Sequence, residues 1–195
     1  MTDIQKRLDT TWSVPDIDPL PDNHRHGLVA VSAFALLSAI ATSSMVCFIT
    51  YRLIFWRRYT KNYLGYNQFV VLIYNLLIAD FLQSIAFSLN IYWIANNKIH
   101  SPSTTCFVQG LLVQVGDPGS GLFALAIALQ TFMQVVLSRR LEHKWFVAGV
   151  VGIWVFEIIM AIIPIATHGG DPFAPTGAWV SILYFTVHVY VLTLE

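Results

Sequence analysis

One carboxylic acid in the middle of a long apolar segment constrains the fold of this chain more than any other feature. The segment runs from Gln68 to Ile94, which is long enough for a helix to cross a bilayer core of about 30 Å once. Asp80 would lie close to the membrane midplane, and Ser84, one helical turn further, continues the same polar face. An ionisable group at that depth must face other helices or trapped water. The sequence therefore predicts that several transmembrane helices pack around Asp80.

The overall composition is typical of a membrane protein. Hydrophobic residues make up 56% and charged residues 11% of the 195 residues, whereas about a quarter of the residues in soluble domains are charged. The formal net charge is zero, which argues against a nucleic-acid partner. Residues 1–26 differ, because they contain five aspartates, three prolines and no apolar run. We expect a flexible extracellular tail at 1–26 and a membrane domain at 27–195.

Five apolar stretches are long enough to span the bilayer, which predicts an all-α, polytopic transmembrane helix bundle. The predicted spans cover residues 27–51, 68–94, 106–137, 145–167 and 178–194. The first and third loops contain seven lysines and arginines, whereas the second and fourth contain one. Because cytoplasmic loops are enriched in basic residues, we expect a multi-pass protein of the plasma membrane with its N-terminus outside and its C-terminus in the cytoplasm.

The third span is interrupted by the sequence Asp117-Pro118-Gly119-Ser120-Gly121. Proline removes a backbone hydrogen bond from a helix and glycine loosens the backbone, so we expect a kink or a locally unwound turn at Pro118, Gly119 and Gly121. In the alternative interpretation, Asp117 caps a helix that begins at Pro118, and residues 106–116 form a partly inserted loop.

Two further acids, Asp117 and Glu157, would lie at about the same membrane depth as Asp80. The spans contain no lysine or arginine that could neutralise them. A carboxyl group in that environment either stays protonated or holds a cation such as sodium. These acids and Ser84 predict a polar core that switches by binding or releasing a proton or a cation. In the alternative interpretation, protonated acids only form hydrogen bonds between helices. Such bonds are also expected from four glutamines of the third span: Gln109, Gln114, Gln130 and Gln134.

The residues Asn75-Leu76-Leu77-Ile78-Ala79-Asp80 resemble the second-helix signature of seven-helix G-protein-coupled receptors. The run IADFLQSIAF and the third span resemble, more specifically, the fungal receptors related to slime-mould cyclic-AMP receptors and to glucose-sensing receptors. The third-span residues that carry this resemblance are Cys106, Gln109-Gly110, Gly116-Asp117, Gly121 to Ala128 and Thr131-Phe132.

This resemblance implies a receptor that binds a small extracellular molecule and couples through its cytoplasmic loops to a heterotrimeric G protein. It also implies a sodium ion held by the acid of the second helix, Asp80. The candidate G-protein contacts are basic residues of the loops: Arg57, Arg58, Arg139, Arg140 and Lys144. The alternative role of these residues is to anchor the loops against anionic lipid.

The sequence also departs from the pattern of that family. The sixth and seventh helices are missing, so we expect a truncated product that does not signal as a complete receptor does. The loop before the fifth span contains no cysteine and Cys47 lies deep in the first span, so we expect Cys106 to form no disulfide.

Two other functional classes can be weighed from the residues. A transporter or channel subunit would also use midplane acids for proton or ion passage, although transporters usually contain paired interrupted helices and only the third span is interrupted here. An enzyme is not expected, because the spans offer neither a nucleophile beside a base nor a zinc-protease motif. The two cysteines lack the spacing of metal ligands, so we expect no metal site of that kind.

Overall fold

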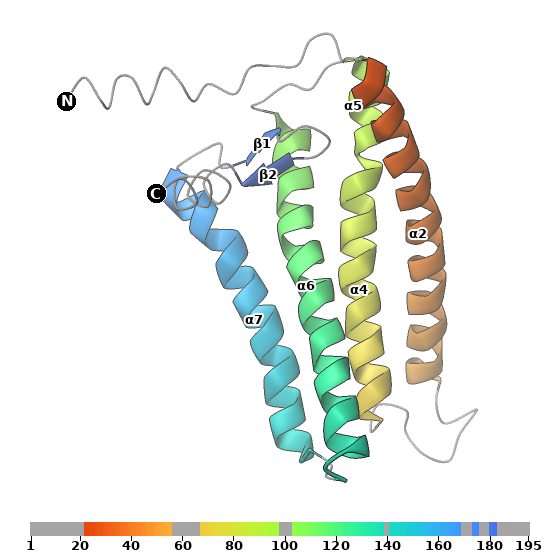
Figure 1. The fold of residues 1–195 in the computed structure, drawn as a ribbon, viewed down its shortest axis with the longest axis vertical. Coiled ribbons are helices and arrows are strands. Elements are labelled where there is room, and N and C mark those ends of the chain that lie inside the picture. The colour runs from red at the N-terminus through yellow and green to blue at the C-terminus, as the bar shows by residue number, and fades with distance from the viewer. Residues whose placement is uncertain are drawn as a thin grey trace, which may run out of the picture.

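The computed structural model describes residues 22–55, 67–97, 103–138, 141–168, 173–175 and 180–182. It shows a bundle of long helices and one small β-hairpin (Figure 1). The helices are α2 (Asp22–Ile54), α4 (Gln68–Ser88), α5 (Asn90–Asn96), α6 (Thr104–Val135) and α7 (His143–His168). The strands β1 (Phe173–Pro175) and β2 (Val180–Ile182) pair antiparallel and contact α6.

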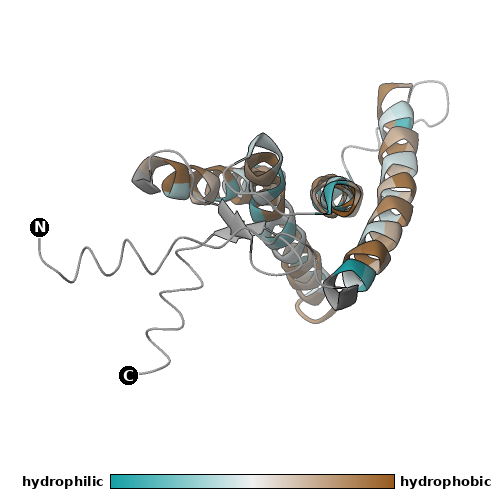
Figure 2. Ribbon diagram, turned by 90° about the horizontal axis from the view of Figure 1, so that it is seen from above, coloured by the Kyte–Doolittle hydropathy of each residue, from teal (hydrophilic) through white to brown (hydrophobic). Residues whose placement is uncertain are grey.

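Four spans of the described chain are long and apolar enough to cross a membrane: Arg25–Ile54, Gln68–Asn96, Thr104–Val135 and His143–Ala166. Large apolar side chains point outward from them, and Phe34 and Val135, for example, are each 74% exposed. Figure 2 shows hydrophobic stretches along these helices. A soluble monomer rarely exposes apolar area on this scale, whereas a bilayer provides matching surroundings. The predicted transmembrane helix bundle is confirmed for the first four spans.

Two predicted boundaries are wrong. Helix α2 begins at Asp22, so residues 22–26 are helical and do not belong to a flexible tail. Arg25 and His26 are exposed, and polar residues of this kind disfavour a helix only slightly, so the helix can extend beyond the apolar segment. The predicted fifth span begins at residue 178, but Val180–Ile182 form β2, because β-branched side chains favour strands. The other residues of the predicted tail and fifth span lie outside the described residues.

Helices α4 and α6 pack against each other in opposite directions and form the central pair of the bundle (Figure 1). Buried residues of α4 and α5 recur every seven positions: Leu72, Ala79, Ala86 and Trp93. Buried residues of α6 do the same: Gln109, Gly116, Phe123 and Gln130. A seven-residue repeat keeps one face of a helix toward its partner and is typical of helices that cross at about 20°. Helix α2 packs on the α4 side of this pair and α7 on the α6 side.

Small residues allow α4 and α6 to approach closely near the middle of their contact. A Cβ atom added to Gly116 would lie 2.8 Å from Gln83 N and 2.9 Å from Gln83 Cα. A Cβ atom added to Gly119 would lie 3.4 Å from the Cβ of Ala79. Glycine at position 116 is therefore required by the packing of the two helices.

Helix α6 runs through Pro118 without a break. The prediction that the helix continues past this residue is confirmed, whereas the unwound turn and the alternative helix start at Pro118 are not found. Membrane helices tolerate proline where neighbouring helices and local adjustments satisfy the freed backbone groups. A Cβ atom added to Gly121 would meet nothing within 4 Å, so packing does not require that glycine. A bend at Pro118, Gly119 and Gly121 stays a prediction.

The predicted second span consists of two helices, because a turn at Leu89 separates α4 from α5. Before this turn, Ser84 Oγ donates to Phe81 O at 2.9 Å and Ser88 Oγ donates to Ser84 O at 2.7 Å. Serine hydroxyls that bond to carbonyls of the preceding turn often bend a helix. The serines that continue the polar face of Asp80 therefore also mark the end of the regular helix.

Candidate functional site

The carboxyl group of Asp80 lies at the interface between α4 and α6. Ser120 Oγ of α6 donates a hydrogen bond to Asp80 Oδ1 at 2.6 Å. The neighbouring contact, in which Gln83 faces Gly116, follows the same antiparallel register. A hydroxyl on an adjacent helix is one of the ways in which a membrane protein accommodates an ionisable group away from water. The prediction that Asp80 faces another helix is confirmed.

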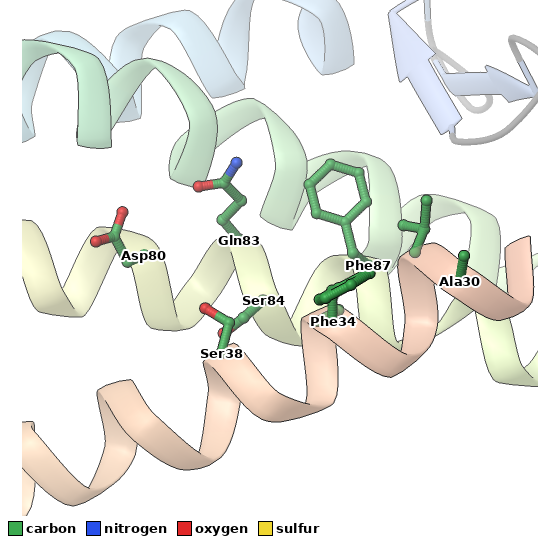
Figure 3. Close-up of a pocket in the computed structure, with 9 residues that line it drawn as sticks. Ala30, Phe34, Ser38, Asp80, Gln83, Ser84 and Phe87 are labelled. Carbon is green, nitrogen blue, oxygen red and sulfur yellow. The ribbon is translucent and has the colours of Figure 1, made fainter. Parts of the chain in front are cut away.

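A cavity of about 410 Å³ lies beside Asp80, between α2 and α4. Its lining residues are Ala30, Val31, Phe34, Ala35 and Ser38 from α2, and Asp80, Gln83, Ser84 and Phe87 from α4. In Figure 3, Asp80 lies toward one end and Phe34 and Phe87 lie toward the other, with Ser38 and Ser84 between them. The cavity therefore has a polar half with a carboxyl group and two hydroxyls, and an aromatic half.

A buried hydrogen-bonded cluster joins α5 to the first turns of α6. Trp93 Nε1 donates to Gln109 Oε1 at 2.7 Å, and Gln109 Nε2 donates to Asn90 Oδ1 at 2.7 Å. Asn90 and Gln109 are fully buried, and Trp93 is 3% exposed. Gln109 uses both ends of its amide, so the interhelical role predicted for this residue is confirmed.

Three further hydrogen bonds lie nearer the opposite end of the bundle. Gln130 Nε2 donates to Gln68 Oε1 at 2.8 Å, and Gln68 Nε2 donates to Leu141 O at 2.9 Å. Trp154 Nε1 of α7 donates to Asn75 Oδ1 of α4 at 2.8 Å. The interhelical role predicted for Gln130 is also confirmed, and α7 is connected directly to the helix that carries Asp80.

The other two predicted acids do not join Asp80. Glu157 of α7 is fully buried, and neither of its carboxyl oxygens bonds to a described residue. Asp117 lies on the exposed side of α6. In the described ranges, no group of three or more His, Cys, Asp or Glu residues could hold a metal ion. The acids share a depth but not a site, because depth along a helix does not determine the face on which a residue lies.

The remaining predicted residues lie away from this cavity or outside the described residues. Lys144 is exposed in the first turn of α7 and forms an ion pair with Glu142 at 2.9 Å. Cys106 is 2% exposed at the start of α6, and Cys47 is exposed on α2. The four arginines predicted to contact a G protein fall outside the described residues, so those contacts stay predictions: Arg57, Arg58, Arg139 and Arg140.

Several residues that build the interhelical contacts were not predicted from the sequence as partners. Asn75, Asn90 and Ser120 are three of them. Each lies three or four positions after a buried residue of the seven-residue repeat, namely Leu72, Ala86 and Gly116. A polar residue at that spacing lies next to the same seam of a helix pair. Extending the repeat along both helices would have singled these residues out.

The sequence is similar to a known protein over part of its length. No family model matches the sequence. Over 81 residues, or 42% of this chain, the sequence is 31% identical to the Frizzled and smoothened-like protein O of Dictyostelium discoideum. The aligned part covers 11% of the length of that protein. The chain is therefore similar, over a limited stretch, to a Frizzled- and smoothened-like protein.

Proposed function

We propose that this chain is the membrane-embedded part of a receptor that senses a small extracellular molecule and couples to a heterotrimeric G protein. The observation that carries this proposal is the Asp80–Ser120 contact, which joins the two central helices next to a cavity that reaches α2. A polar contact between helices can change their packing when a proton or a cation binds, and a changed packing reaches both membrane surfaces. The similarity to the Frizzled and smoothened-like protein O supports a receptor-type role.

The proposed orientation places the N-terminus outside the plasma membrane. The cavity beside Asp80 is lined by the first half of α2 and the second half of α4, so in this orientation it lies in the outer half of the bundle. The basic loop residues, Lys144 among them, then lie on the cytoplasmic side, where a G protein binds. The closer relation to fungal receptors of the cyclic-AMP and glucose-sensing type stays a prediction.

A hard monovalent cation such as sodium fits the polar half of this cavity, because the Asp80 carboxyl group there would balance its charge. Hard cations prefer oxygen ligands. Asp80 supplies a carboxyl group, Ser120 bonds to it, and Ser38 and Ser84 supply two more hydroxyl oxygens around the same cavity. These side chains come from α2, α4 and α6, so an ion held among them would connect three helices.

Replacing Asp80 by asparagine is expected to leave the protein inserted and folded but to remove the dependence of its thermal stability on sodium. At a sodium concentration ten times the Kd, binding stabilises the folded state by about 1.4 kcal/mol, or roughly 3 to 6 °C for a chain of this size. The measurement is the thermal unfolding midpoint in detergent, with sodium chloride and choline chloride compared at equal ionic strength.

The matched control for that experiment is Asp117→Asn, because Asp117 is an exposed acid on α6 three residues before Ser120. This variant should keep the sodium dependence of the wild type. A wild-type midpoint that does not respond to sodium, or an Asp80→Asn midpoint that still does, would rule out Asp80 as the ion site.

G-protein coupling is tested by nucleotide exchange on a purified heterotrimer. The chain is placed in nanodiscs, and exchange is compared with that produced by empty nanodiscs and by the Asp80→Asn variant. A faster exchange that changes in the variant supports the receptor function. Exchange equal to that of empty nanodiscs contradicts G-protein coupling by this chain on its own.

One observation favours a second candidate function, a transporter or channel subunit. Glu157 is a fully buried acid without a hydrogen-bond partner in the described part of the chain, as expected of a group that takes up and releases a proton. In sealed vesicles with a pH-sensitive dye inside, a transporter would show proton flux that Glu157→Gln abolishes. A receptor would show no flux in either protein.

A further inference from the structure

A second cavity, of about 330 Å³, lies at the opposite end of the bundle from α5, where α6 ends and α7 begins. Its walls come from α4, α6, α7 and the segment before α7, and they are mostly apolar: Leu129, Met133, Trp145, Phe146, Gly149 and Ile153 are examples. None of these residues lines the cavity beside Asp80. The second cavity is therefore a separate site.

The cavity wall contains two glutamines, Gln130 and Gln134, and the first is hydrogen-bonded within the protein. Gln130, which contributes to the wall, donates to Gln68 Oε1 at 2.8 Å. Gln68 in turn donates to the carbonyl of Leu141, a second wall residue, at 2.9 Å. Among the residues that the structure describes, no Asp, Glu, Lys or Arg side chain lines the cavity. The wall therefore favours an apolar ligand over a charged one.

The cavity borders the side of the bundle that faces lipid. Leu129 and Trp145, both wall residues, are 55% and 65% exposed. Because α6 and α7 are long and apolar enough to cross a bilayer, we expect acyl chains next to these side chains. An empty cavity between apolar walls forfeits dispersion contacts, which an acyl chain entering from the adjacent lipid would restore. Tryptophan and lysine are common at the headgroup level, and Trp145 follows the exposed Lys144.

We propose that this cavity binds one acyl chain of a bilayer phospholipid, whose headgroup lies at the level of Lys144 and Trp145. The site is independent of the receptor function and of which membrane side this end faces. A lipid bound here contacts α4, α6 and α7 at once, since the walls come from all three helices.

Two glycines of α7 provide a matched pair for testing this proposal. A Cβ atom added to Gly149 meets nothing within 4 Å, and Gly149 is part of the cavity wall. A Cβ atom added to Gly152 also meets nothing within 4 Å, but Gly152 does not line the cavity. A leucine at position 149 would therefore occupy the space of the acyl chain, whereas a leucine at position 152 would extend elsewhere.

The experiment is native mass spectrometry of the protein released from phosphatidylcholine nanodiscs into mild detergent. The wild type and Gly152→Leu are expected to retain one phospholipid. Gly149→Leu should lower the apparent affinity for the lipid, calculated from the retained fraction, by about tenfold. The smaller substitution Gly149→Val should give an intermediate loss, and it carries the test if Gly149→Leu fails to fold by circular dichroism. Equal retention in all variants, no retained lipid in the wild type, or an equal loss in Gly152→Leu would overturn the proposal.

Discussion

Replacing Gly116 by alanine is expected to destabilise the bundle by about 2 kcal/mol and to lower its thermal midpoint in detergent by roughly 4 to 8 °C. The added Cβ atom would lie 2.8 Å from Gln83 N and 2.9 Å from Gln83 Cα. These are backbone atoms, so no side chain can turn aside to make room. Helices α4 and α6 must instead move apart, which also strains the hydrogen bond between Asp80 and Ser120.

The control for this substitution is Gly121→Ala, five residues later on the same helix. A Cβ atom at position 121 meets nothing within 4 Å, so the substitution adds no clash. Alanine is a better helix former than glycine, and the midpoint should stay the same or rise slightly. If both alanine substitutions change the midpoint by the same amount, the close approach at Gly116 does not contribute to stability.

Replacing Gln109 by leucine should produce the second large loss, again of about 2 kcal/mol. The substitution keeps the volume of the side chain but removes both hydrogen bonds of its amide, from Trp93 Nε1 and to Asn90 Oδ1, each 2.7 Å long. The indole N–H and the amide oxygen would then stay buried without partners, since Asn90 is fully buried and Trp93 is 3% exposed. The measurement is the thermal unfolding midpoint, with tryptophan fluorescence as the signal that reports unfolding.

Two comparisons separate this polar effect from a general effect of substitution in α6. Gln114→Leu is the matched control, because Gln114 is half-buried and its side chain forms no hydrogen bond in the described part of the chain. The thermal midpoint of this variant should therefore differ little from that of the wild type. A double-mutant cycle that combines Gln109→Leu with Trp93→Phe should be non-additive. Strict additivity would show that the Trp93–Gln109 bond does not stabilise the protein.

The first four helices could be predicted from length and hydropathy alone, because the thickness of the bilayer determines how long an apolar helix must be. Helix α4 begins at Gln68 as predicted, and α6 and α7 begin at Thr104 and His143, two residues before the predicted starts. The fifth span was less predictable. Short apolar runs rich in valine and isoleucine fit a helix and a strand equally well, and Val180–Ile182 form a strand.

The environment of Asp80 could be predicted only in part. Its depth in the second span indicates that it needs a partner, but Ser120 lies 40 positions away in the sequence. The periodicity of each helix shows which of its residues share a face, and does not show how two helices are aligned along each other. That alignment depends on where the backbones can approach closely, as they do where Gly116 contacts Gln83. Glu157 and Asp117 were grouped with Asp80 by depth, and rotation about their own helices separates them.

The hydrogen bonds described above also determine which parts of the bundle are free to move. Side-chain hydrogen bonds join α4–α5 to α6 at three levels along the helices. They connect Gln109 with Asn90, Ser120 with Asp80, and Gln130 with Gln68. Sliding one helix along the other would break all three bonds together, so we expect the two elements to move as one rigid body. Helix α2 packs against α4 and α5, and Thr50 Oγ1 of α2 is 3.0 Å from the Tyr74 hydroxyl of α4. If the proposed receptor function holds, we expect the pair of α4–α5 and α6 to move as one body, and α2 and α7, which pack on its two sides, to be displaced relative to it.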